Sequence, residues 1–253
     1  MRIIRRLIIA FSIYSRIPMP HFKWEEKDYK YNLCFLPFVG AVIGAIVWAV
    51  RYLCEKIGFP LIATICLITA VPLIITGGFH VDGFMDVKDA LNSYKSQEEK
   101  LAILKDPHIG AFAVINLGLY GLLWLAALSV ICDRNTMGFV LPLVFVLSRT
   151  VTAISSVTLR KAKKDGMLSS ETKMSGRIEL AVMIAELLIV IGALVFINPY
   201  AAILLLVVCV TVFIGYRYKT YKEFGGVTGD TAGYLVCVSE LMMLMALAVF
   251  SLL

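Results

Sequence analysis

The sequence predicts an all-α fold, a polytopic bundle of about seven membrane-spanning helices. Two observations carry this prediction. Of the 253 residues, 60% are hydrophobic and only 17% are charged, whereas about a quarter of the residues in soluble domains are charged. The mean hydropathy is +0.85. Too few charges are present to coat a water-soluble globule, so we expect a single membrane domain over residues 1–253 with the lipid bilayer as its solvent.

The N-terminal segment is the first predicted element. Its apolar run, residues 7–13, is too short to cross a hydrocarbon layer of about 30 Å. Arg2, Arg5 and Arg6 precede this run, and arginines beside a short apolar stretch are typical of a helix that lies at the membrane surface. We therefore expect an interfacial or half-inserted helix before the first span.

Seven apolar stretches of suitable length follow and are the predicted spans. They cover residues 33–53, 59–76, 109–131, 137–157, 179–197, 200–216 and 234–253. The sixth stretch is the shortest. The second contains Pro72, which is expected to bend that helix near its end.

Basic residues alternate between the two sides of the predicted membrane. Four segments hold seven, four, six and three Lys or Arg residues, namely 1–32, 77–108, 158–178 and 217–233. The connections on the other side hold only Lys56 and Arg134. Because short cytoplasmic loops carry the excess of Lys and Arg, we expect the four segments in the cytoplasm and the protein in the inner membrane. The net charge of +6 then serves orientation and lipid headgroups, and no nucleic acid partner is expected.

Segment 77–108 is the richest candidate for chemistry, a catalytic loop or short helix. Asp82, Asp86 and Asp89 stand at positions i, i+4 and i+7, so they share one face of a helix. Three carboxylates this close repel one another. A divalent cation removes the repulsion, and Mg²⁺ commonly binds one or two carboxylates together with substrate phosphates. The pattern predicts a magnesium site, although a solvated acidic helix face has the same spacing.

Other polar residues of this segment allow two interpretations each. His80 is a candidate general base or a buried structural histidine. Asp106 is a candidate fourth carboxylate, with Lys105 as a phosphate contact. Alternatively, Asp106 caps the helix that follows, with Pro107 at its first position.

A second candidate site element covers residues 223–240, where a Gly-rich turn opens the last span. Such a turn can present backbone N–H groups to a phosphate at a helix N-terminus. The residues expected to do so are Gly225, Gly226, Thr228 and Gly229. Asp230 either caps the helix or joins the metal site.

Two charged residues inside predicted spans need a partner or a ligand. Arg149 lies in the fourth span and Glu240 in the last, where an unpaired charge is costly. We expect Arg149 either to pair with Glu240 or to reach a substrate phosphate.

Several separated motifs resemble those of one family, the cobalamin synthases or adenosylcobinamide-GDP ribazoletransferases. The run GGFHVDGFMDVKDA at 77–90 is similar to the signature of the family, and further blocks follow the same order at 14–20, 35–44, 103–110 and 225–240. The chain departs from the family at Ser15, Met85 and Ala90, and at Pro107 and His108, where serine and arginine are usual. Histidine is a weaker cation than arginine, which argues against a phosphate contact at position 108.

The resemblance implies the last assembly step of cobalamin (vitamin B12) biosynthesis, in which adenosylcobinamide-GDP is joined to α-ribazole or its 5′-phosphate and GMP is released. It also implies Mg²⁺ as the cofactor. For this chemistry we expect Asp82, Asp86 and Asp89 to hold the metal on the diphosphate, and Asp106 and Asp230 to complete the site. Either His80 or one of the carboxylates would take the proton of the attacking hydroxyl. Lys105 and Arg149 are the expected phosphate contacts.

Other protein classes share parts of this pattern. CDP-alcohol phosphotransferases use an Asp-Gly pair, but their further Ala-Arg pair and spaced aspartates are missing from 77–108. Membrane prenyltransferases need two Asp-rich motifs, and the region of Asp230 holds one Asp. A transporter would place charged residues along the spans, whereas most charges here lie in the loops. The residues leave open whether the chain forms a homo-oligomer.

Overall fold

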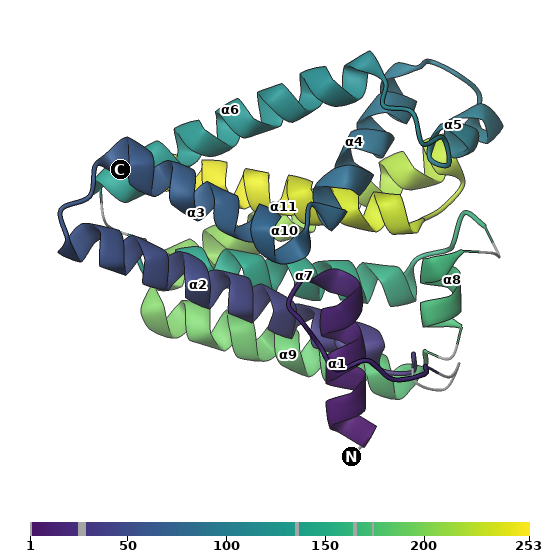
Figure 1. The fold of residues 1–253 in the computed structure, drawn as a ribbon, viewed down its shortest axis with the longest axis horizontal. Coiled ribbons are helices and arrows are strands. Elements are labelled where there is room, and N and C mark those ends of the chain that lie inside the picture. The colour runs from purple at the N-terminus through teal and green to yellow at the C-terminus, as the bar shows by residue number, and fades with distance from the viewer. Residues whose placement is uncertain (1, 25–28, 135–136, 164–165, 174) are drawn as a thin grey trace.

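The computed structural model describes residues 2–24, 29–134, 137–163, 166–173 and 175–253, and those residues form helices and no strand. The elements are α1 Arg2–Tyr14, the 3₁₀ helix η2 Asn32–Phe35, α2 Leu36–Lys56, α3 Leu61–Thr76, α4 Phe79–Asn92, α5 Gln97–Ile103, α6 Ala111–Arg134, α7 Leu141–Thr158, α8 Met167–Thr172, α9 Arg177–Ile197, α10 Pro199–Phe224 and α11 Gly229–Phe250 (Figure 1). The predicted all-α fold is confirmed. Lys27 and Lys164, counted among the loop cations, lie outside the described residues.

Six helices are long and apolar enough to cross a membrane: η2 with α2, then α6, α7, α9, α10 and α11. The pair of α3 and α4, which is bent by 91°, gives a seventh crossing if the two helices together form one span. Gly77 and Gly78 make this bend with φ values of 61° and 80°, a backbone region that glycine enters without steric cost. The bend turns α4 across the ends of the neighbouring helices (Figure 1). The bent pair of α3 and α4 thus stands where the second span was expected.

Two boundaries differ from the sequence-based expectation. The bend expected at Pro72 falls later, because α3 continues to Thr76 and the glycine pair makes the turn. The sixth span was expected to be the shortest, yet α10 has 26 residues and is the longest α-helix in the described part of the chain. Its last turns carry Arg217, Lys219 and Lys222, so the helix continues into the polar region beyond its apolar run.

Small residues set the closest contact between spans. Gly40 and Gly44 stand one turn apart in α2, against the backbone of Phe145 and Pro142 in α7, where a Cβ on either glycine would overlap. Small residues at this spacing let helices approach closely within a membrane. The main apolar core surrounds this contact. A second apolar cluster, containing Phe84 and other side chains of α4, α10 and α11, lies at the polar end.

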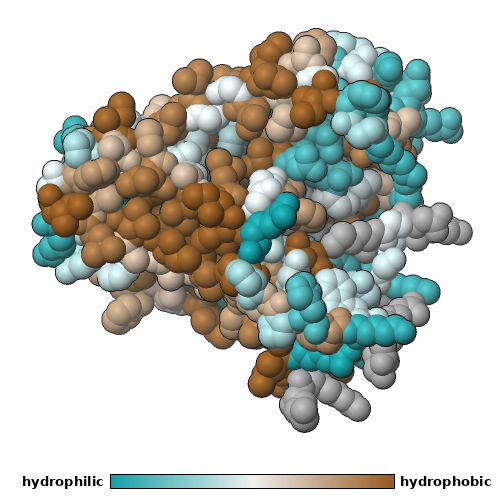
Figure 2. Space-filling view, in the orientation of Figure 1, coloured by the Kyte–Doolittle hydropathy of each residue, from teal (hydrophilic) through white to brown (hydrophobic). Residues whose placement is uncertain are grey.

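The four basic segments meet at one end of the bundle. Three hydrogen bonds join them, from Tyr14 Oη to Glu171 (2.9 Å), from Val227 N to Arg160 O (2.9 Å) and from Lys163 Nζ to Leu101 O (3.1 Å). Hydrophilic side chains gather over this end, and hydrophobic ones cover much of the rest of the face shown in Figure 2. The predicted grouping of these segments on one side is confirmed.

Candidate active site

A cavity of about 230 Å³ opens at the polar end, and we call it the charged cavity. Two carboxylates and two cations line it: Asp82, Asp230, Lys105 and Lys163. They come from α4, the start of α11 and two different loops. Carboxylates can hold a cation and lysines attract phosphate, so the charged cavity has the composition expected of a site for a metal-bound diphosphate.

Two glycines bring the acidic residues of the charged cavity together. A Cβ on Gly83 of α4 would lie 2.7 Å from the carbonyl oxygen of Asp230, and a Cβ on Gly233 of α11 would lie 3.0 Å from the carbonyl oxygen of His80. The helices α4 and α11 therefore touch backbone to backbone. This contact places Asp82 and Asp230, which are far apart in the sequence, on one cavity.

The residues of the Gly-rich turn before α11 have different structural roles. Gly225 ends α10 at φ 75°, and Gly226 lies so close to the backbone of Arg160 that a side chain would overlap. Thr228 is the helix cap, since its side chain accepts a hydrogen bond of 3.2 Å from the N–H of Thr231. Thr228 and Gly229 line the charged cavity. Of the predicted phosphate contacts, these two are in place, while Gly225 and Gly226 shape the turn.

The cap assignment also excludes one of the two alternatives left open for Asp230. Because Thr228 caps α11, Asp230 is not the cap, and it lines the charged cavity. Its half-buried carboxylate stands in the first turn of the helix. An anion there is favoured by the helix dipole.

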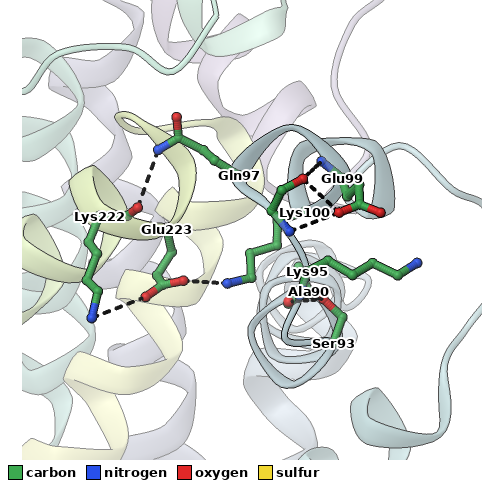
Figure 3. A network of polar contacts seen from close by, with 9 residues as sticks. Ala90, Ser93, Lys95, Gln97, Glu99, Lys100, Lys222 and Glu223 are labelled. Atoms are coloured by element: carbon green, nitrogen blue, oxygen red, sulfur yellow. Dashed lines mark hydrogen bonds and ion pairs between the residues drawn. The ribbon is translucent and has the colours of Figure 1, made fainter.

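Helix α5 positions Lys105. A capping box of Ser96 and Glu99 begins this helix, and Lys100 donates to Glu223 at the end of α10 over 2.5 Å (Figure 3). Lys100 is buried and Glu223 is mostly buried, so the ion pair holds α5 against α10. Lys105 follows directly after α5 and reaches the charged cavity.

Lys163 is a cavity residue that the sequence did not single out. It belongs to the basic segment 158–178, for which orientation and lipid headgroup contact were favoured over binding of a polyanionic substrate. Burial and the nearby charge of Lys105 lower the pKa of Lys163. Its neighbour Lys161 instead donates to the carbonyl oxygens of Ser156 and Leu159. The run of cations contains no signal that separates the two lysines.

The aspartates of α4 lie on one helix face as predicted, but they do not all face the charged cavity. Asp86 is half-buried, and burial together with the charges of Asp82, Asp230 and Asp89 raises its pKa to about 6. Asp89 lies against Gly110. Within the described residues, no three His, Cys, Asp or Glu side chains form a ready-made metal-binding set. Asp82 and Asp230 nevertheless match the one or two carboxylates that Mg²⁺ commonly takes beside substrate phosphates.

Three further predicted site residues lie away from the charged cavity. His80 is buried with 5% of its surface exposed. Asp106 is exposed and accepts from the backbone N–H (3.0 Å) of His108, whose ring also lies 2.6 Å away; these contacts hold the pKa of Asp106 below its ordinary range. Since α6 begins only at Ala111, Asp106 is not its cap.

Arg149 is the third of these residues. It pairs with Glu240 inside the bundle, and the two side chains are 1% and 4% exposed. The structure thus contains the first of the two arrangements expected for Arg149, the ion pair with Glu240. Its phosphate contact stays a prediction, as do the catalytic roles of His80 and Asp106.

The fold and the site define a class, a multi-pass membrane protein with a cavity lined by charged residues at the polar end of its helices. The family model described as cobalamin-5-phosphate synthase matches residues 6–248. The chain belongs to this family, which confirms the resemblance seen in its motifs.

Relatives of similar length carry one name. An adenosylcobinamide-GDP ribazoletransferase of Lachnoclostridium phytofermentans is 36% identical over 245 residues, 96% of this chain and 92% of the relative. A ribazoletransferase of the same name from Clostridium botulinum (strain Alaska E43 / Type E3) is 33% identical over 97% of each chain. A third, from Listeria monocytogenes, is 30% identical over 96% of this chain and 99% of the relative. No solved structure matches this chain.

Proposed function

We propose that this chain joins adenosylcobinamide-GDP to α-ribazole or α-ribazole 5′-phosphate and releases GMP. The family match over residues 6–248 carries the proposal, together with the name shared by full-length relatives. The charged cavity supports it, because two carboxylates and two lysines suit a diphosphate with its cation. The buried Arg149–Glu240 pair argues against the transporter alternative, since paired charges offer no open path.

The reaction would be a displacement at the phosphorus that bears the cobinamide. A ribose hydroxyl oxygen forms the new P–O bond, the bond to the bridging oxygen breaks, and GMP leaves with that oxygen. Lys105 and Lys163 would hold the phosphates in the charged cavity. The hydroxyl proton would pass to a carboxylate rather than to His80, because His80 lines neither of the two cavities that Asp82 lines. Asp82 lines both of these cavities and is therefore the carboxylate best placed for this task.

Magnesium is the proposed cofactor, held by Asp82 and Asp230 with Asp86 beside them. When bound, the ion would offset negative charge on the diphosphate and on the leaving GMP. The cation would also relieve the repulsion among the carboxylates. Asp89 is the least supported ligand of the predicted set, since its carboxylate lies against Gly110.

Release of GMP tests the activity directly. The purified protein, incubated with adenosylcobinamide-GDP, α-ribazole and Mg²⁺, is expected to yield GMP and a cobalamin product of matching mass in equal amounts. A chelator should stop both. Turnover that persists with all divalent cations removed would refute the metal, and absence of both products under all conditions would refute the activity.

We also propose that the polar end faces the cytoplasm of a cell whose inner membrane holds the protein. The excess of Lys and Arg in the four segments supports this orientation. Tyr94, 91% exposed, marks the polar end, and Phe196, 92% exposed, lies by the short α9–α10 connection. In a Cys66→Ser background, an impermeant thiol reagent should label Phe196→Cys in intact cells and Tyr94→Cys only in opened ones. The reverse pattern would overturn the orientation.

A further inference from the structure

A second cavity, of about 100 Å³, lies within the apolar part of the bundle, between α3, α4, α6, α7 and α11. We call it the inner cavity. Most of its wall is apolar or aromatic, including Leu73, Leu117, Tyr120, Trp124 and Val236. Such a wall favours a flat apolar ligand.

Three polar atoms in the wall of the inner cavity have no hydrogen-bond partner among the residues that the structure describes. They are His80 Nδ1, Trp124 Nε1 and Arg149 Nε, on residues that are 5%, 3% and 1% exposed. A buried polar atom without a hydrogen-bond partner destabilises the folded protein, and a ligand that pairs with it gains affinity. The Trp and Arg atoms are obligate donors, so an apolar occupant that also accepts a hydrogen bond would be favoured over a purely apolar one.

We propose that the inner cavity binds the aromatic base of the ribazole substrate, an inference that rests on the proposed function. The base is a benzimidazole, a flat and largely apolar bicyclic ring. The ring nitrogen that does not carry the ribose is a hydrogen-bond acceptor. A dry cavity of about 150 Å³ takes benzene, and the inner cavity, at about 100 Å³, is smaller. The side chains of its wall would therefore move apart as the base enters. A lipid chain would fill the apolar wall but would leave both donors unpaired.

The position of the inner cavity fits this role. Thr76 and Val81 line both the inner cavity and an open groove of about 660 Å³. Phe79 and Asp82 line both that groove and the charged cavity. The three spaces therefore follow one another around the start of α4. A base held in the inner cavity would leave its ribose in the groove, with the hydroxyl beside Asp82.

A filling substitution on α6 tests the proposal. Gly121 lines the inner cavity, and a Cβ added there would meet no atom within 4 Å. Gly118, in the same helix, has equal space and lies outside that wall. Gly121→Leu is expected to raise the KM for α-ribazole about tenfold or more. The KM for adenosylcobinamide-GDP should stay unchanged, and Gly118→Leu should behave as the wild type.

A wild-type KM for α-ribazole in a folded Gly121→Leu protein would overturn the proposal and leave water as the occupant. If Gly121→Leu fails to fold, calorimetric titration of Gly121→Ala and Gly118→Ala with α-ribazole decides instead. Weaker binding only in Gly121→Ala supports the site, and equal binding refutes it. Failure of the proposed function is distinguishable, because the wild type would then release no GMP.

Discussion

Charged residues occupy two contrasting regions of this molecule. In the charged cavity, Asp82 and Lys105 are exposed at the polar end, where two carboxylates and two lysines share one wall. Inside the bundle, Arg149 and Glu240 are almost fully buried and neutralise each other. Water at the polar end tolerates charges that await a ligand, whereas the bundle interior demands a partner within the protein. The location of a charge thus indicates whether it serves chemistry or structure.

The largest expected effect concerns the charged cavity. Asp82→Asn should lower the rate of GMP release by about 10³-fold, on the scale seen when one group that stabilises transition-state charge is removed. The exposed position of Asp82 predicts little change in unfolding free energy. Asp133→Asn, an exposed change at the end of α6, is the matched control. An Asp82→Asn protein with full turnover would show that Asp82 does not serve the chemistry and would contradict the contrast between the two regions.

The buried pair should show the opposite behaviour. Glu240→Gln leaves the Arg149 charge without a counter-charge, which is expected to cost about 3–5 kcal/mol of unfolding free energy. Unfolding by SDS in mixed micelles measures the loss. Glu98→Gln, a change at an exposed residue, is the control and should change the unfolding free energy little. Equal stability of the two variants would contradict a structural role for the pair.

A third buried charge, Glu171 of α8, ties stability to pH. Its pKa is raised to about 7 by burial, against the lowering effect of hydrogen bonds from Tyr14 and Asn32. The folded chain therefore keeps a proton that the unfolded chain releases above about pH 4.5. The stabilising contribution is fully present below that pH and is lost as the pH rises through about 7.

Glu171→Gln removes this dependence. The variant should match the wild type near pH 5 and be more stable near pH 8, by up to about 3 kcal/mol at roughly 1.4 kcal/mol per pKa unit. Unfolding free energies at the two pH values measure the difference. A variant whose stability follows the wild type across the range would show that Glu171 ionises as an ordinary carboxylate.

The smallest effect is expected for Lys163. Lys163→Met should raise the KM for adenosylcobinamide-GDP about tenfold, because one phosphate contact is worth roughly 1–2 kcal/mol, and should leave stability unchanged. Lys56→Met, at the end of α2, is the control for loss of a surface cation. If both variants keep the wild-type KM, Lys163 serves orientation only, as the sequence first suggested.

Hydropathy and cation counting predicted the spans and the shared side of the basic segments, because both reflect the bilayer as solvent. The spacing of the aspartates alone predicted the acidic face of α4. The sequence did not predict the bend at Gly77 and Gly78, because glycine also occurs freely within membrane helices. The extra turns of α10 were missed because Arg217 and Lys219 end the apolar run without ending the helix.

Within the candidate site, the roles of several residues depend on tertiary contacts that the sequence does not reveal. Asp82 and Asp230 were named from their local motifs, but their common cavity depends on the contact of Gly83 with Asp230 across α4 and α11. Lys163 and Lys161 lie in the same basic run of the sequence. In the fold, Lys163 lines the charged cavity, whereas Lys161 donates to a backbone carbonyl oxygen. Asp230 was the candidate cap in the sequence, and the hydrogen bond that Thr228 accepts from the N–H of Thr231 gives this role to Thr228.

The backbone contact between α4 and α11 has a consequence for biogenesis. Helix α4 is synthesised well before α11. Until α11 has inserted, the nascent chain holds Asp82 without Asp230, and the backbone of Gly83 lacks its contact with Asp230. A chain that stalls before α11 therefore has only one of the two carboxylates that line the charged cavity. The acidic part of this cavity would be completed only when α11 inserts.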